Sequence, residues 1–329
     1  MPTANAVEAA RSLGLGRAAF ALYHRPVGFV RKSIAEGGPW QQHRTEIGRR
    51  AMVSAAERLP PFAMPEMDGG ARVTFLSGDK YWYQTLFCFA SLQSHSAERI
   101  TPVIVDDGTL VADVRQLIRR VVPWAEFVAL DVVEACLDRQ LPVSRYPSLR
   151  ARRREYAHLR KLIDIHLGAP GWTLVLDSDM LFFRRPDAVL DWFRDSRPIF
   201  MQDIGTMYGY SQALMEELAG GPVPARVNVG LYALHGPSID WDRVEFWCRS
   251  QIEREGPHYL QEQGLTALLL AGGQAKPLST IDYVVMPSLG EGRSATAVLH
   301  HYVAQSKRSY FQHGWRHVAA RLAAISSDH

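Results

Sequence analysis

The chain has 329 residues, 47% of them hydrophobic and 22% charged, which predicts two average domains or one large α/β domain with an extension. This composition excludes disordered, collagen-like and disulfide-framework proteins. The net charge is only +3, and the whole surplus lies in residues 1–70, so no general binding of nucleic acid is expected.

The cysteines Cys88, Cys136 and Cys248 lie far apart without the spacing of a zinc site. They indicate free thiols in a reducing compartment, so a cytoplasmic location is expected. No apolar run approaches the ~18 residues that a membrane span needs. The N-terminus also lacks the pattern of a secretory signal peptide.

Residues 1–70 are predicted to form a helical and irregular extension. Gly37-Gly38-Pro39 and Pro60-Pro61 are expected to interrupt it, and Gly69-Gly70 to act as a hinge before the first strand. Its modest positive charge is compatible with a peripheral contact with the inner face of a membrane.

Beyond residue 70, short apolar runs alternate with longer amphipathic stretches. The runs predicted as strands are residues 73–76, 102–105, 126–130 and 172–176. The stretches predicted as helices lie near residues 82–95, 111–121 and 155–167. This alternation predicts an α/β fold with a mostly parallel mixed sheet. Because the strands lack polar alternation, helices are expected to flank both faces of the sheet.

The pattern continues with strands predicted at residues 198–201, 227–234 and 283–286 and a helix at 259–270. The main domain is therefore expected to span residues 71–312. In residues 313–329, Val318, Leu322 and Ile325 share one helical face, which predicts a C-terminal amphipathic helix and tail.

The strongest chemical signal follows the predicted strand 172–176, where only Ser178 separates Asp177 from Asp179. In an open α/β sheet, ligands bind beyond the carboxyl ends of the strands, so a reactive site is expected there. Two carboxylates at this spacing can hold one Mg²⁺ or Mn²⁺, which in turn binds phosphates. The apolar residues 180–183 return the chain to the core, and burying both acids without a metal or basic partner would be costly.

Two other interpretations of this pair remain open. One acid could cap a helix while the other is solvated, which is the usual situation for an isolated Asp-x-Asp. The pair could also be the nucleophile and the acid/base of a phosphatase, although that superfamily has Thr or Val where this chain has Leu181.

A basic run extends from Arg145 to Lys161 and contains a single acid, Glu155. Such a run is usually a solvated loop followed by the start of a helix. Because the run contains Pro147 and follows Pro142, a mobile flap that closes over phosphates is the alternative.

Residues 299–307 read Leu-His-His-Tyr-Val-Ala-Gln-Ser-Lys, and residues 156–162 read Tyr-Ala-His-Leu-Arg-Lys-Leu. With the Asp-x-Asp, these segments resemble motifs of the GT-A glycosyltransferases, and more narrowly of the retaining group that includes glycogenin and bacterial lipopolysaccharide galactosyltransferases. The resemblance extends from about residue 72 to residue 310. It implies a Rossmann-like GT-A fold, a Mn²⁺ or Mg²⁺ cofactor and a nucleotide-sugar donor.

The resemblance implies a metal site made of Asp177, Asp179 and His301, in which Lys307 contacts the diphosphate. His300 is the rival for the third ligand. A lone histidine is more often a hydrogen-bonded polar residue than a ligand. His301, however, lies six residues before Lys307 in a chain with an Asp-x-Asp.

Other segments are implied to bind the donor. Arg160 and Lys161 would approach the sugar and phosphates, whereas Asp79 and Tyr81 would bind the nucleotide base, with uridine as the default. The positions that depart from the family's residues are Gly78, His158, Glu262 and Ala304.

The resemblance also implies that Gln263, Glu262 and Asn228 are catalytic, since they match residues that lie beside the transferred sugar. Neither amide is a strong nucleophile, which suits substitution on the same face with retained configuration. A double displacement would need a carboxylate, for which Glu262 and Asp203 are the candidates. Glu262 could instead be a first-turn acid that the helix dipole favours.

The sequence thus predicts a metal-dependent glycosyltransferase that moves a sugar from a nucleotide-sugar to a glycan, lipid-linked or protein acceptor. A sugar-nucleotide pyrophosphorylase is an alternative. That class has a Gly-rich loop with Arg and Lys after the first strand, whereas residues 77–80 contain only one glycine and one lysine. A non-catalytic carbohydrate-binding protein of the same fold is another. The sequence does not indicate the acceptor, the donor sugar or the oligomeric state.

Overall fold

The structure is a computed structural model that describes residues 37–327. Most of the predicted N-terminal extension, residues 1–36, and the last two residues of the tail lie outside the described residues. None of the helices in the described part combines the length and the apolar character needed to cross a bilayer.

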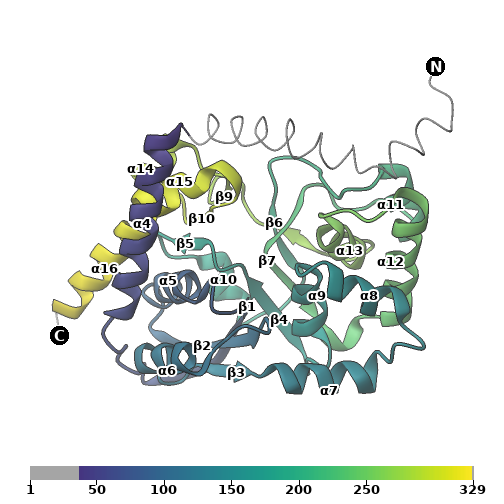
Figure 1. The fold of residues 1–329 in the computed structure, drawn as a ribbon, viewed down its shortest axis with the longest axis horizontal. Helices are drawn as coiled ribbons and strands as arrows, with labels where there is room; N and C mark the ends of the chain where they lie inside the picture. The colour runs from purple at the N-terminus through teal and green to yellow at the C-terminus, as the bar shows by residue number, and fades with distance from the viewer. Residues whose placement is uncertain (1–36, 328–329) are drawn as a thin grey trace, which may run out of the picture.

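A seven-stranded sheet forms the centre of the molecule, in the order β3-β2-β1-β4-β7-β6-β8 (Figure 1). Its strands are β1 (Met67–Ser77), β2 (Glu98–Asp106), β3 (Glu126–Val128), β4 (Trp172–Leu176), β6 (Ile199–Gln202), β7 (Val227–His235) and β8 (Lys276–Pro277). Strand β7 runs antiparallel to both β4 and β6, whereas the other neighbours pair in parallel. The predicted mostly parallel mixed sheet is therefore confirmed.

A smaller sheet of three strands lies beside the end of β4. It has the order β5-β10-β9, with β5 (Met180–Phe182), β9 (Tyr283–Val285) and β10 (Leu299–His301). The chain enters this sheet directly after Asp179, so the apolar residues that follow the acid pair do return to the core, as predicted. The predicted strand at 283–286 belongs here and not to the main sheet.

Helices cover both faces of the main sheet, as the apolar strands predict (Figure 1). On one face, α5 (Trp82–Gln93) and α6 (Ala112–Val121) cover the sheet, and α4 (Pro39–Glu57) and α16 (Trp315–Ser327) pack against α5. The other face packs against helices α7 (Leu130–Gln140), α8 (Pro147–Glu155), α9 (Leu159–His166), α11 (Gln212–Ala219), α12 (Trp241–Glu255) and α13 (Gln261–Leu270). Along β4, Leu174 and Leu176 face the first core and Val175 the second, because successive side chains of a strand alternate.

The remaining described helices are short. They are α10 (Asp187–Trp192), η2 (Gly236–Ser238), α14 (Leu289–Ser294), η3 (Ala304–Ser306), α15 (Lys307–Ser309) and the π-helix η4 (Tyr310–Gly314). Together with α4 and α16, the last four of these elements form one end of the molecule (Figure 1).

The helix predicted at residues 155–167 is instead two helices, α8 and α9. The backbone of Tyr156 is extended, with φ −130° and ψ 95°, which ends α8. The guanidinium of Arg152 lies 4.5 Å from the centre of the Tyr156 ring, and the Tyr156 hydroxyl donates a hydrogen bond to the carbonyl of Tyr259. These tertiary contacts favour the break over a continuous helix.

Helix α8 also corrects the interpretations of the basic run as a solvated loop or a flap. Arg153 is buried and pairs with Asp164, with 2.6 Å between Nε and Oδ1, while Arg150 pairs with Asp138 at 2.9 Å. Arg152 donates a 2.7 Å hydrogen bond to Gln261. The arginines of this run therefore hold α8 to its neighbours.

Helix α4, the described part of the predicted extension, packs against η4 and α5 through Gly48, Met52 and Ala56. A Cβ atom at Gly48 would lie 2.8 Å from the carbonyl carbon of Phe311 and closer still to its oxygen. Only glycine permits this approach, because both atoms that a Cβ would meet belong to the backbone.

The predicted domain boundaries at residues 70 and 312 remain predictions.

Gly48→Ala is expected to destabilise the protein by about 1–3 kcal/mol through this clash. Without the close contact, the same change in a helix interior would stabilise the protein by about 1 kcal/mol. The sign of the change in the free energy of unfolding therefore shows whether α4 packs closely at Gly48. The measurement is chemical denaturation, with Ile47→Ala as the control, since Ile47 is 52% exposed on the same helix. An unchanged or raised free energy of unfolding in Gly48→Ala would show that α4 does not pack there.

Candidate active site

The acid pair lies at the carboxyl end of β4, where the chain passes from the main sheet into the smaller one. The backbone N–H of Asp177 donates to the carbonyl of Gly230 at 2.7 Å, and the carbonyl of Asp179 accepts from Tyr302 at 2.9 Å. The Ser178 hydroxyl is 2.8 Å from that of Thr85, in the first turn of α5. These contacts fix the turn against three different elements.

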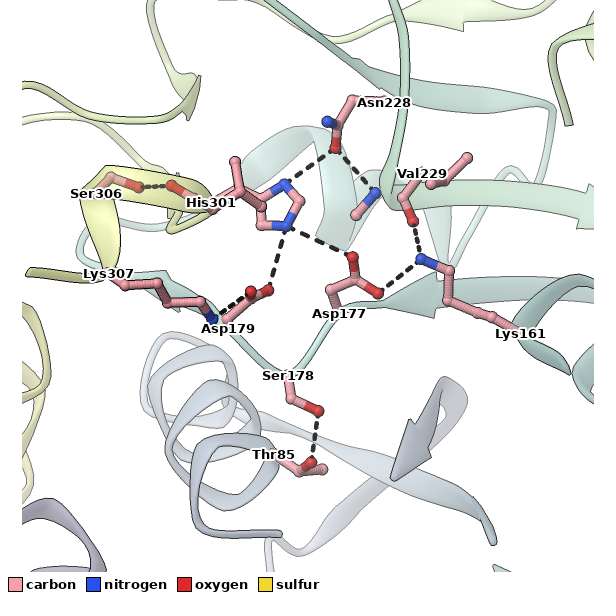
Figure 2. A network of polar contacts seen from close by, with 12 residues as sticks. Thr85, Lys161, Asp177, Ser178, Asp179, Asn228, Val229, His301, Ser306 and Lys307 are labelled. Atoms are coloured by element: carbon pink, nitrogen blue, oxygen red, sulfur yellow. Dashed lines mark hydrogen bonds and ion pairs between the residues drawn. The ribbon is translucent and has the colours of Figure 1, made fainter. Parts of the chain in front are cut away.

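Asp177, Asp179 and His301 converge so closely that one ligand atom from each lies within 4.8 Å of the others (Figure 2). The Nε2 atom of His301 is 3.2 Å from Asp179 Oδ1 and 3.5 Å from Asp177 Oδ2. That nitrogen is buried and has no hydrogen-bond partner of good geometry. Two carboxylates and an imidazole are a suitable donor set for Mn²⁺, and the unpartnered Nε2 points toward the position that a cation would take.

The charges of this cluster are strongly coupled. Burial lowers the pKa of His301, but the two carboxylates outweigh it and raise that pKa to about 9. Burial raises the pKa of Asp177, whereas Lys161 and His301 lower it below its usual value. Lys307 and His301 have the same effect on the pKa of Asp179. Both acids are therefore ionised and available as metal ligands at neutral pH.

A chain of hydrogen bonds orients His301. Its Nδ1 donates to Oδ1 of Asn228 at 3.0 Å, and the same oxygen accepts the backbone N–H of Gly230 at 2.9 Å. Since a backbone N–H can only donate, this contact fixes which end of the Asn228 amide faces the ring. The amide nitrogen donates in turn to Oδ2 of Asp203 at 3.0 Å. With Nδ1 held as a donor to Asn228, the proton on Nε2 of the imidazolium faces the two carboxylates, and a metal ion would replace that proton.

His300 points to the opposite side of β10, because side chains alternate along a strand. Its Nε2 is 2.7 Å from Oε1 of Glu291 and its Nδ1 is 2.9 Å from the hydroxyl of Tyr302. The interpretation of His300 as a rival metal ligand is therefore wrong.

Two lysines flank the acid pair from opposite sides (Figure 2). The Nζ atom of Lys307 is 2.5 Å from Asp179 Oδ2, and that of Lys161 is 2.7 Å from Asp177 Oδ1. Lys161 is buried and also donates to the carbonyl of Val229 at 2.8 Å. Burial lowers the pKa of Lys161, but the surrounding carboxylates raise it above its usual value, so it remains an ammonium.

Glu262 and Gln263 lie buried in the first turn of α13, on the far side of Lys161. Oε1 of Glu262 is 3.4 Å from Lys161 Nζ, and burial raises the pKa of this acid to about 7 despite the lysine. Nε2 of Gln263 donates to the carbonyl of Met207 at 2.8 Å and is 3.3 Å from Oδ2 of Asp203. Asp203 thus joins the two predicted amides, Asn228 and Gln263.

From the sequence, Asp203 is predicted only as a candidate nucleophile, so its bonds to the two amides are a role that only the structure shows. The signal was present, since Asp203 directly follows β6 and polar residues at strand ends favour a site.

Asp79, Tyr81 and Arg160 form a second group at the ends of β1 and β2. Arg160 Nη1 donates to the carbonyl of Asp107 at 2.5 Å, and the backbone N–H of Asp79 donates to Oγ1 of Thr109 at 3.1 Å. The side chains of Asp79 and Tyr81 are exposed. Within the described residues, this group has no direct contact with the acid pair and is joined to it through Thr85, whose hydroxyl donates to the Tyr81 carbonyl.

The structure shows the local surroundings of two of the positions that depart from the residues implied by the resemblance. A Cβ atom at Gly78 would meet the side chains of Asp107 and Thr109, so a larger residue fits there only if these side chains move. Ala304 has a φ of 47°, in the left-handed region that favours glycine, and this conformation costs a non-glycine residue about 1 kcal/mol. The backbone conformation at Ala304 thus remains the one that glycine prefers.

No protein-family model and no curated protein sequence matches the chain. Three solved structures with a similar fold are glycosyltransferases. They are the galactosyltransferase LgtC with donor and acceptor sugar analogues (15% identity, TM-score 0.48, covering 77% of this chain and 95% of LgtC), mouse xyloside xylosyltransferase 1 in its apo form (11%, 0.43, 70% and 96%) and the bifunctional glycosyltransferase WbbM in its apo form (10%, 0.46, 74% and 47%). At these identities and TM-scores, the similarity concerns the general fold and does not assign a role to any residue of this chain.

His301→Gln and His300→Gln form a matched pair, since both remove a buried histidine from β10. His301→Gln is expected to weaken Mn²⁺ binding by about 100-fold, because a ligand is lost, whereas His300→Gln should keep the affinity within about twofold. Isothermal titration calorimetry with Mn²⁺ measures both. Equal losses in the two variants would exclude the Asp177, Asp179 and His301 site.

Proposed function

We propose that the protein is a metal-dependent glycosyltransferase of the GT-A type that uses a nucleotide-sugar donor. The convergence of Asp177, Asp179, His301 and Lys307 is the observation that carries the proposal. Four charged or metal-binding side chains from three separate segments meet at the carboxyl end of one strand, which is where α/β proteins bind ligands.

Breaking the bond between the anomeric carbon and a diphosphate places negative charge on the leaving group. Asp177, Asp179 and His301 would hold Mn²⁺ or Mg²⁺, which as a Lewis acid stabilises that charge. Lys307 would add a second positive charge beside the leaving group. Lys161 would keep Asp177 ionised and in place, since its ammonium lies 2.7 Å from that carboxylate.

The transferred sugar would lie near Glu262, whose oxygen Oε1 is buried and has no hydrogen-bond partner of good geometry. Such an oxygen is suited to accept hydrogen bonds from sugar hydroxyls. Gln263 would lie beside the ring. The side chain of Asn228 already bonds to His301, Gly230 and Asp203, so we assign it to the positioning of His301 rather than to contact with the sugar.

We propose that the anomeric configuration is retained by substitution on one face. The acceptor oxygen would bond to the anomeric carbon as the bond to the diphosphate breaks, and the acceptor proton would pass to the departing phosphate oxygen. A double displacement through Asp203 is disfavoured, because its Oδ2 already accepts from Asn228 and Gln263 and its Oδ1 from the backbone of Ile204.

Asp79 and Tyr81, exposed at the end of β1, are proposed to bind the base, with a uridine diphosphate sugar as the first donor to test. Arg160 would support this loop through its bond to Asp107. Three free cysteines support a reducing, cytoplasmic location, and a peripheral membrane contact remains a proposal.

Hydrolysis of sugar nucleotides without an acceptor is the direct test of activity. Wild-type protein is expected to release nucleoside diphosphate from a UDP-sugar only with Mn²⁺ or Mg²⁺, and Asp179→Ala should reduce the rate by at least about 100-fold. Asp113→Ala, at an exposed position of α6, is the matched control and should retain the rate. No release from any sugar nucleotide would favour the non-catalytic carbohydrate-binding alternative, and synthesis of a sugar nucleotide from a sugar phosphate would favour the pyrophosphorylase.

Retention is tested separately by the stereochemistry of the first product. Proton NMR of the sugar released or transferred from an α-linked donor is expected to show the α anomer before mutarotation. An initial β anomer would show inversion and would require a general base that the proposed mechanism lacks.

A further inference from the structure

A cavity of about 350 Å³ adjoins the acid pair on the side of Lys307. One wall is the face of α4 that carries Gln42, Thr45 and Arg49. The opposite wall comes from η3 and α15, with Gln305, Lys307 and Arg308. A volume of this size lies at the lower end of the range for small-molecule sites.

The position of α4 makes this cavity a fixed feature. Gly48 holds the helix directly against the backbone of Phe311, and Gln312 on the same segment donates to Thr45 Oγ1 at 3.0 Å. One wall of the cavity is therefore a docked helix, and the other is the short segment 304–308. The docked helix belongs to the N-terminal extension, outside the part of the chain that resembles a glycosyltransferase.

The walls carry more positive than negative charge. Glu46 is the one acid that lines the cavity in the described part of the chain, and it is already bound to Arg49 by two hydrogen bonds of 2.8 Å. On the opposite wall, Nε of Arg308 is buried without a hydrogen-bond partner. Among the basic side chains of the lining, Arg49 pairs with Glu46 and Lys307 with Asp179, whereas no acid pairs with Arg308 in the described part of the chain, so its guanidinium can pair with a bound anion.

The cavity lies next to the proposed reaction centre. Lys307, which lines it, places Nζ 2.5 Å from Asp179 Oδ2. A ligand in this cavity would therefore have one end beside the departing diphosphate, where an acceptor hydroxyl must approach for substitution on one face.

We propose that this cavity binds the acceptor, and that the acceptor carries a phosphate or carboxylate group that pairs with Arg308. The identification of the ligand as the acceptor rests on the proposed glycosyltransferase activity, whereas the binding of an anionic sugar does not depend on that activity. The exposed amide of Gln305 lines the cavity and is suited to bind hydroxyls, so the acceptor class is an anionic sugar or sugar-containing molecule.

The test is calorimetric titration of the full chain with three probes: glucose 6-phosphate, glucuronate and neutral glucose. Both anionic sugars are expected to bind at least tenfold more tightly than glucose, and the stronger of the two identifies phosphate or carboxylate as the preferred group. Binding should persist when the protein is saturated with UDP and Mn²⁺. Equal binding of glucose, or no binding of any probe, would overturn the proposal.

Loss of binding in the presence of UDP and Mn²⁺ would also overturn it, since the anion would then occupy the donor site. Arg308→Gln is expected to weaken anionic probes at least tenfold, and Gln305→Glu, at an exposed position, should do the same by charge repulsion without risk to the core. Arg44→Gln, on the exposed face of α4 outside the cavity, is the control and should change nothing. Unchanged binding in Arg308→Gln and Gln305→Glu would exclude this cavity.

Because the titrations require no turnover, the outcomes are separable. Absence of metal-dependent hydrolysis in the wild type contradicts the proposed function alone, whereas hydrolysis without binding of an anionic probe contradicts the acceptor cavity alone.

Discussion

Two carboxylates held at the end of a buried strand are the constraint on which the rest of this site depends. Neither Asp177 nor Asp179 could remain ionised there without opposite charge. Lys161 compensates the first acid, Lys307 the second, and His301 lies between both. Lys161 comes from α9, whereas His301 and Lys307 lie six residues apart on β10 and α15, so the need to neutralise two acids favours the packing of two distant segments of the chain at the end of β4.

The fold and the acid cluster were predictable because their signals are local or follow from topology. Strand β4 is an unbroken apolar run that ends at Asp177, and this pattern alone places a polar site at the edge of the sheet. The resemblance implies His301 rather than His300 as the ligand, and the structure separates the two, because adjacent residues of a strand face opposite sides. The roles of the site residues remain predictions that the proposed measurements address.

Contacts between segments explain what the sequence could not predict. The break at Tyr156 depends on Arg152 and on Tyr259, over one hundred residues away, and helical periodicity contains no information about either. Clustered arginines look like a phosphate site in sequence, but Arg150 and Arg153 have acids of α7 and α9 as partners. In the same way, only tertiary structure shows that Asp203 orients the amides of Asn228 and Gln263.

Because α4 docks at Gly48, the charges around the acid pair and one wall of the cavity beside them come from different parts of the chain. The charges of the proposed reaction centre belong to the sheets and to the segments that connect their strands, whereas one wall of the cavity beside them belongs to a single appended helix. Such a helix can be exchanged or can drift in sequence while the catalytic centre stays intact. Selectivity for new substrates could therefore evolve, or be engineered, by changing a few side chains on α4 while the metal-binding residues remain untouched.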